Sequence, residues 1–226
     1  MTINYENLEQ IITPQRLEIY RPEGRDIPLT FAEYEKNIRL AEALYPSLHV
    51  FEIVLRNRLE QLLQQLFGEE WFHEPRLFRI ISQPLRNKIA DALTGFEEKN
   101  KERLEENKAT KLLTSGRVVA ELSLSFWTTM LDPYHEQIFW HSHQKMIFPN
   151  AQKTERVIKT IRAELREIRK LRNRVMHHEP ILYDKNLLEK HQNLSKLLTW
   201  LSNDAGTWLQ PFDRFAGVHN SLGSAA

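Results

Sequence analysis

The segment from about Thr154 to His178 constrains the fold most strongly, because its apolar residues recur at helical spacing in an otherwise highly charged stretch. On an ideal helix, with about 100° per residue, these residues share one sector roughly 100° wide. The sector contains Ile158, Ile161, Leu165, Ile168, Val175 and Met176. A helix with one narrow apolar stripe must bury it against other elements, so we expect a long helix here that packs centrally in the fold.

Arg172 falls near the middle of this apolar sector. A guanidinium group on the core-facing side of a helix is costly unless a carboxylate or a phosphate meets it. Glu52 is a candidate partner, because it lies about 40° from the centre of another predicted apolar stripe. The alternative is an i,i+4 pair between Glu52 and Arg56 at the margin of their own helix. We expect Arg172 to be buried or nearly so and held by a carboxylate, with Glu52 the first candidate.

The composition favours a single helical domain. Of the 226 residues, 41% are hydrophobic and 27% are charged, which is enough for a sizeable core. Only 7 glycines occur, and runs of Leu, Glu, Lys, Arg and Gln favour helix. The formal net charge is +1, so any surface that binds nucleic acid must be a local basic patch. We therefore expect an all-α fold.

The composition also bears on location. Cysteine is absent, which excludes disulfides and thiolate chemistry and suits a cytoplasmic protein. No apolar run approaches the roughly 20 residues of a membrane span. The N-terminal sequence MTINYENLEQ is acidic and polar, unlike a signal peptide. We expect a cytoplasmic protein without a membrane partner.

The predicted elements follow one another without a linker that splits the chain. We expect an N-terminal extension (1–28), one helical domain (29–215) and a disordered tail (216–226). The first domain helix should start at Thr30, with Glu33 completing a capping box. The other expected elements are, in order, a short helix 14–20, a turn 21–26, helices 30–45 and 46–68 or one helix kinked at Pro46, a loop or short helix 71–81, a charged helical insertion 84–108, an apolar helix from about Ser115 to Leu131, a connector 135–150, the helix 154–178 and a last helix from 186 to 201 or beyond.

Several kinds of site lack support in the sequence. The 9 histidines invite a metal site, but His141 and His143 alternate in a connector, and the His177–Glu179 segment lacks the spacing of a zincin. Structural or surface histidines are the better interpretation. No Gly-rich phosphate loop and no Gly-x-Ser-x-Gly motif occurs, which argues against a P-loop ATPase and a serine hydrolase.

The end of the central helix carries the residues best suited to chemistry. His177 lies four residues after Asn173, on the polar flank that also holds Arg162 and Arg166. Imidazole can move a proton near neutral pH, although cations near a helix C-terminus are often only structural. Arg172 and His177 differ by about 140° around an ideal helix. Either the final turn loosens before Pro180 or a second chain completes the site.

At these residues the chain resembles a known family. The sequence Arg172–His177 fits the Arg-x4-6-His motif of the HEPN superfamily, and RNRVMHHEPI is similar to the form found in bacterial abortive-infection (Abi-like) proteins. Three further segments match in order: FEIVLRNRL from Phe51 to Leu59, GEEWF from Gly68 to Phe72, and VVAELSLSFWTTML from Val118 to Leu131. The resemblance extends from about Arg16 to Phe215.

The resemblance implies a HEPN-like helical bundle and a metal-independent endoribonuclease of a phage-defence or toxin type, with no cofactor. Cleavage would proceed by attack of the ribose 2′-hydroxyl, and two copies of the motif helix would form a composite site in a homodimer. An antitoxin or a phage-derived trigger is a possible partner besides RNA. The implied roles are catalytic for Arg172 and His177, supporting for Asn173, Glu52 and His178, and RNA-binding for Arg162, Arg166 and Arg56.

Two alternatives stay open. The first is a non-catalytic helical dimer that binds RNA, a nucleotide or a phage protein, and the second is a purely structural helical adaptor. Some HEPN toxins carry a tyrosine two residues after the histidine, where an antitoxin modifies it. Glu179 occupies that position here, so the sequence does not support this form of control.

Overall fold

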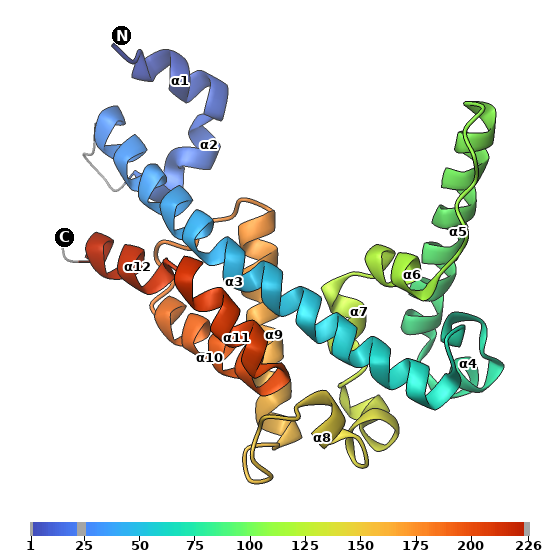
Figure 1. Cartoon of the computed structure of the whole chain (residues 1–226). Helices are drawn as coiled ribbons and strands as arrows, with labels where there is room; N and C mark the ends of the chain where they lie inside the picture. The colour runs from blue at the N-terminus through green and yellow to red at the C-terminus, as the bar shows by residue number, and fades with distance from the viewer. Residues whose placement is uncertain (1, 22–25, 224–226) are drawn as a thin grey trace.

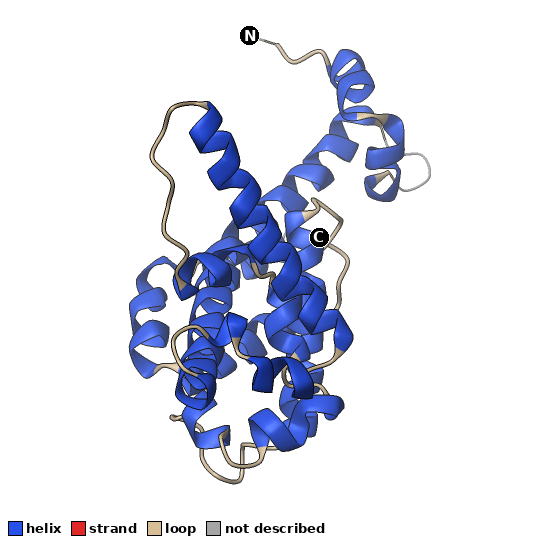
Figure 2. Ribbon diagram, turned by 90° about the vertical axis from the view of Figure 1, so that its right-hand side faces the viewer, coloured by secondary structure: helices blue, strands red, loops and turns tan. Residues whose placement is uncertain are grey.

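One helix, α3 (Ile27–Phe67), forms the spine of the molecule (Figure 1). The computed structural model describes residues 2–21 and 26–223, and α3 takes up 41 of them. At 1.5 Å per residue, such a helix is about 60 Å long. The described residues contain helices and loops but no strand (Figure 2). The all-α fold expected from the sequence is therefore confirmed.

The first domain helix starts earlier than expected, and it continues through Pro46 to Phe67, which agrees with the alternative of a single helix. The helix starts at Ile27 rather than Thr30, because the Asp26 carboxylate caps it by accepting a hydrogen bond from the N–H of Leu29 at 2.8 Å. The Thr30 hydroxyl instead donates to the Asp26 carbonyl. Pro46 lies inside the helix and does not end it. Leu44 and Leu48 are buried on either side of Pro46, so packing outweighs the lost backbone hydrogen bond.

The central helix α9 (Ile158–Met176) packs on α3 beside α10 (Leu187–Leu201) and α11 (Asn203–Leu209). Four residues of the predicted stripe are buried, Ile161, Leu165, Ile168 and Val175, together with Leu171, whereas Ile158 and Met176 are only partly buried. The helix is shorter than the expected range, since it begins at Ile158 and ends at Met176. Residues 154–157 and 177–178 lie outside it.

The apolar segment expected as one helix to Leu131 forms two helices, α6 (Ser115–Glu121) and α7 (Leu124–Thr129). Ser123 between them has an extended backbone. Residues 122 and 124 would point in nearly opposite directions on one helix, at about 200°. The break lets Leu122 and Leu124 both enter the core. Phe126 and Trp127 are core anchors, as expected.

Short elements complete the lower part of the molecule. The connector after α7 contains no long helix, and Phe139 and Phe148 fix it to the core. Six short elements are η2 (Trp71–His73), α4 (Pro75–Ile80), η3 (Pro133–His135), η4 (Glu136–Trp140), α8 (Gln144–Ile147) and η5 (Gln210–Phe212).

The N-terminal extension packs against α3 through buried Leu17 and Tyr20. It contains α1 (Tyr5–Ile12), which was not predicted, followed by α2 (Pro14–Leu17) and η1 (Glu18–Tyr20), which cover the predicted short helix. Most of the predicted turn, residues 22–25, lies outside the described residues.

The C-terminal tail is helical where disorder was expected. Helix α12 (Phe215–Gly223) contacts α3 and α10. The Phe215 ring is fully buried and packs against His191. The Asp213 carboxylate accepts hydrogen bonds from the N–H of Phe215 and from His191 Nε2. This anchor was missed because a lone phenylalanine after a polar stretch gives no periodic signal; residues 224–226 lie outside the described range.

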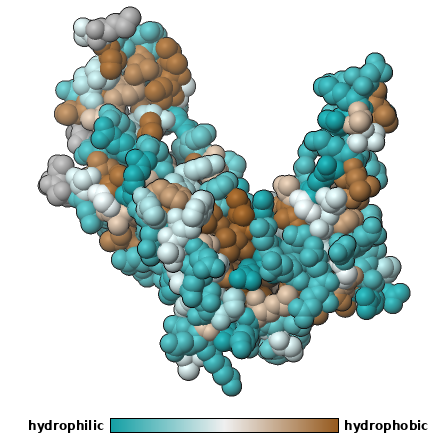
Figure 3. Space-filling model, in the orientation of Figure 1, coloured by the Kyte–Doolittle hydropathy of each residue, from teal (hydrophilic) through white to brown (hydrophobic). Residues whose placement is uncertain are grey.

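Two arms extend from the body (Figure 1). The start of α3 with α1 and α2 forms one arm, and the far half of α5 (Gln83–Glu105) forms the other. This second arm is the predicted charged insertion, although its helix ends before residue 108, and residues 106–114 return along it. Figure 3 shows a hollow between the arms, with hydrophobic surface on its floor. In the described part of the chain, no helix combines the length and apolar character that crossing a membrane requires.

Candidate functional site

The end of α9 forms a complete Schellman motif. The N–H of His178 donates to the Val175 carbonyl at 3.1 Å, and the N–H of Glu179 donates to the Arg174 carbonyl at 2.7 Å. His178 has φ of +57°, the left-handed conformation that this motif requires one residue after the C-cap. His177 is the C-cap residue. The helix therefore ends before Pro180, but its last turn is regular as far as His177, whose N–H donates to the Asn173 carbonyl.

The predicted ion pair between Arg172 and Glu52 is present. Arg172 Nε donates to Glu52 Oε2 at 2.9 Å, and Nη2 donates to Oε1 at 3.4 Å. The Arg172 side chain is 28% exposed and that of Glu52 is 18% exposed, so the pair is less buried than expected. The i,i+4 alternative with Arg56 does not occur in the described residues. Glu52 occupies one edge of the guanidinium and leaves Nη1 free for another acceptor.

His177 and Asn173 are both exposed at the helix end. They are linked through the backbone, since the His177 N–H donates to the Asn173 carbonyl at 2.8 Å. Within the described part of the chain, no side chain hydrogen-bonds to the His177 imidazole or to the Asn173 amide. One chain thus presents His177 to solvent without fixing the orientation of its ring.

His178 faces a different environment from His177. It lines a surface pocket of 510 Å³ together with Arg16, Tyr34 and Glu179. Arg16 Nη2 donates to the His178 carbonyl at 2.5 Å, so the N-terminal extension caps the end of α9. Arg16 and Tyr34 were not predicted from the sequence, because they lie far from His178 along the chain and such long-range contacts leave no local pattern.

Asn37 fixes the loop that follows the motif. Its side-chain Oδ1 accepts hydrogen bonds from the N–H of Ile181 at 2.7 Å and of Leu182 at 3.1 Å. Asn37 is buried on α3, where a polar residue needs a partner. A buried amide on an apolar helix face is the signal that could have identified it.

The three arginines expected to bind RNA differ in their surroundings. Arg162 is only 14% exposed; its Nε donates to the Leu131 carbonyl, and its Nη2 pairs with Glu136 at 2.7 Å. These bonds attach Arg162 to the connector within the same chain. Arg166 is exposed. The Nε of Arg56 is buried and has no hydrogen-bond partner among the described residues.

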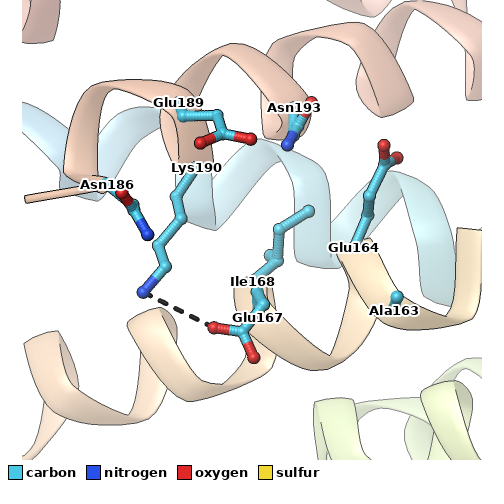
Figure 4. Close-up of a pocket in the computed structure, with 8 residues that line it drawn as sticks. All are labelled: Ala163, Glu164, Glu167, Ile168, Asn186, Glu189, Lys190 and Asn193. Carbon is cyan, nitrogen blue, oxygen red and sulfur yellow. Dashed lines mark ion pairs between the residues drawn. The ribbon is translucent and has the colours of Figure 1, made fainter. Parts of the chain in front are cut away.

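A pocket of 270 Å³ between α9 and α10 is acidic (Figure 4). Glu164, Glu167 and Glu189 line it, and Lys190 crosses it to pair with Glu167 at 3.5 Å. A hydrogen bond from Lys170 and the nearby charge of Lys190 lower the pKa of Glu167. Glu164 is paired as well, with Lys196 at 2.7 Å, so lysines compensate much of the acidic charge of this pocket.

The histidines form no metal site in the part of the chain that the structure describes, where no group of three or more His, Asp or Glu side chains could hold an ion. Buried His135 has a structural role. Its Nε2 accepts a hydrogen bond from the N–H of Ser82 at 3.0 Å, and its Nδ1 lies 2.9 Å from the Thr129 carbonyl. Burial lowers the pKa of His135, consistent with a neutral ring that donates to that carbonyl.

Comparison of the chain with protein-family models, with curated proteins and with solved structures finds no match.

Proposed function

We propose that this chain is a metal-independent endoribonuclease of the abortive-infection type within the HEPN superfamily, acting in phage defence or as a toxin. The observation that supports this most is the end of α9, where His177 is exposed five residues after an arginine held by Glu52. The resemblance of the motif to that superfamily supports the same reaction.

The reaction needs a base for the ribose 2′-hydroxyl, an acid for the leaving 5′-oxygen and positive charge beside the phosphate. His177 supplies proton transfer, which is typically worth 10²–10⁴-fold in rate. Arg172 offers its free Nη1 edge to a phosphate oxygen and stabilises the charge that develops in the transition state. Glu52 holds the guanidinium in place, and Asn173 is exposed one turn before His177 for a further contact with RNA.

One chain supplies one such imidazole, whereas the reaction uses a base and an acid. We therefore place two α9 ends at a two-fold homodimer interface, where each chain contributes a His177. A symmetric dimer repeats the same surface on both subunits, so an exposed helix end can meet its own copy. An antitoxin or a phage-derived trigger would control access to this composite site.

The alternative is a non-catalytic dimer that binds RNA, a nucleotide or a phage protein. The unanchored His177 ring favours it, because catalytic imidazoles are usually oriented by a second group. In this alternative, Arg172 contributes a phosphate contact and His177 contributes no proton transfer.

The test is cleavage of a fluorescently labelled RNA by protein freed of any inhibitor. Cleavage should persist in EDTA, should leave a 2′,3′-cyclic phosphate or its hydrolysed form, and should fail on an all-2′-deoxy substrate because the nucleophile is missing. Loss of activity in EDTA would show that a metal carries the chemistry. Binding of RNA without cleavage would favour the non-catalytic alternative.

A further inference from the structure

Two cations on different helices lie together without a counter-charge. Lys88 on α5 donates from Nζ to Ser125 Oγ at 2.5 Å, and Arg169 on α9 donates from Nη1 to Thr128 Oγ1 at 3.1 Å. Both acceptors belong to α7. Neither cation forms an ion pair with a carboxylate in the described residues. Partly buried charges are normally paired, so two partly buried cations that meet only hydroxyls are unusual.

The two positive charges act on each other. The pKa of Lys88 is lowered, first by burial and then by the charge of Arg169. Two like charges held close together in a partly desolvated place destabilise the fold unless an anion joins them. Two carboxylates near Lys88 do not offset this repulsion between Lys88 and Arg169. Glu121 is paired with Lys99 at 2.5 Å, and Asp91 is exposed to solvent.

Arg56 brings a third cation to the same level of the fold. Helices α3 and α9 run antiparallel, since Asn37 contacts Ile181 while Glu52, further along α3, contacts Arg172. Arg56 lies one turn beyond Glu52 on α3, and Arg169 lies about one turn before Arg172 on α9. Both steps lead in the same direction along the helix pair.

Arg56 also needs an acceptor. Its Nε is buried and has no hydrogen-bond partner among the described residues, and a buried donor without a partner costs about 1–3 kcal/mol. Helix α7 contacts α3, α5 and α9 and lies in the angle between α3 and α5 (Figure 1). Lys88 and Arg169 therefore meet hydroxyls of α7 where four helices come together, and Arg56 lies at the same level along α3.

The geometry points to a phosphate-binding site at the junction of α3, α5, α7 and α9, formed by Lys88, Arg169 and Arg56 with the hydroxyl of Ser125, while Thr128 positions Arg169. A phosphate group offers several acceptor oxygens and a negative charge, which match donors that converge from different helices. The Ser125 hydroxyl lies 2.9 Å from that of Ser123, so it can accept from Lys88 and turn its proton toward a ligand.

The phosphate belongs to the RNA backbone, and this part of the inference rests on the proposed function. Arg169 lies two turns before His177, about 12 Å along α9, and Asn173 lies between them on the same polar flank. A short stretch of one RNA strand spans that distance. The site would bind a phosphate further along the same strand than the cleaved bond and would so fix the path of the strand. A free phosphate or a nucleotide carries the same group.

The experiment compares the full-length wild type with Lys88→Met and Arg169→Gln in two assays. The first measures thermal unfolding with inorganic phosphate against chloride at equal ionic strength. The second measures binding of a 2′-O-methyl RNA, which cannot be cleaved, by fluorescence anisotropy over a range of salt. Lys101→Met, an exposed lysine on the far half of the same helix as Lys88, is the control.

We expect phosphate to raise the melting temperature of the wild type and of Lys101→Met but not of the two site variants. Without phosphate, Lys88→Met should melt higher than wild type, because the repulsion from Arg169 is gone. Each site variant should bind RNA roughly three- to tenfold more weakly, with a salt dependence shallower by about 0.7 per lost phosphate contact.

The results of the two assays distinguish an RNA phosphate from a free phosphate or a nucleotide. If phosphate stabilises the wild type through Lys88 while RNA affinity is unchanged, the site takes a free phosphate or a nucleotide, and the assignment to RNA is overturned. If Lys88→Met destabilises the fold and the response to phosphate persists, Lys88 is only structural and the site does not exist. Neither assay involves cleavage, so failure of the nuclease proposal leaves both readouts intact.

Discussion

At the scale of single residues, four neighbours at the end of α9 have different tasks because each faces a different environment. Arg172 faces α3 and meets Glu52. Asn173 and His177 face solvent, whereas His178 adopts the left-handed conformation that closes the helix and faces the pocket beside Arg16. We therefore assign proton transfer to His177, which lies on the same flank of α9 as Asn173.

Replacing Glu52 with Gln should lower the free energy of unfolding by about 1–2 kcal/mol, because Arg172 would lose its counter-charge while remaining partly buried. RNA cleavage should fall as well, since the guanidinium is no longer fixed. The matched control is Glu35→Gln, which removes an exposed i,i+4 pair with Arg39 and should cost only a few tenths of a kcal/mol. Equal losses in the two variants, measured by urea unfolding, would contradict a special role for Glu52.

Tyr20 predicts a specific dependence of stability on pH. Burial, with a smaller contribution from Tyr34, raises the pKa of Tyr20 from 10.0 to about 12. Between these two values the unfolded chain loses the phenolic proton while the folded chain keeps it, so stability falls as pH rises through this window. Below pH 10 both states keep the proton and the effect vanishes.

Tyr20→Phe should remove this alkaline loss. The Tyr20 hydroxyl is buried and lacks a hydrogen-bond partner in the described region, so the variant should also match or exceed wild-type stability near pH 7. Exposed Tyr134→Phe is the control. The expectation is wrong if chemical unfolding at pH 9 and pH 11 shows the same loss for Tyr20→Phe and wild type.

At the scale of elements, one buried amide joins the spine to the loop after the motif. Asn37→Ala would leave the N–H groups of Ile181 and Leu182 without their acceptor, at about 1–3 kcal/mol for each buried group. We expect a loss of roughly 2–4 kcal/mol in unfolding free energy and faster hydrogen exchange in residues 178–186. Asn57→Ala, an exposed position on the same helix, should change stability by less than about 0.5 kcal/mol. A similar result for both variants would show that the loop does not depend on Asn37.

The elements also show what a sequence can and cannot predict. Periodicity identified the buried stripe of α9, and it paired Glu52 with Arg172 because two charges on apolar faces each require a partner. Local rules left two alternatives at Pro46, and the buried neighbours Leu44 and Leu48 select the one in which α3 is continuous. They failed at Phe215, where one fully buried ring anchors α12.

The candidate site was predictable only in part, because sequence patterns report on neighbouring residues and not on contacts between distant segments. The motif residues are neighbours in sequence, so their pattern is visible. Lys88 and Arg169 meet the hydroxyls of Ser125 and Thr128 only after α5, α7 and α9 come together. Nothing in the local sequence around any of these residues marks them, because the contacts join distant segments.

At the scale of the whole molecule, the proposal requires a dimer. The proposed reaction needs both a base and an acid, and we assign the second role to His177 of another copy. Light scattering at micromolar concentration should give twice the mass of one chain, and cross-linking should join the two α9 ends. A monomer at every concentration tested would remove the composite site, although Arg172 and Glu52 would still pair within each chain.

The most direct test of the central claim is the rate of RNA cleavage in EDTA by wild type, His177→Ala and His178→Gly. His177 is exposed, so its replacement should leave the melting temperature unchanged while cleavage is abolished. His178→Gly removes the neighbouring imidazole and suits the φ of +57°, so it should retain activity and gain about 0.5–1 kcal/mol of stability. The assignment of His177 as the proton-transfer residue would be contradicted if His177→Ala cleaved RNA at the wild-type rate. It would also be contradicted if both variants lost cleavage activity equally.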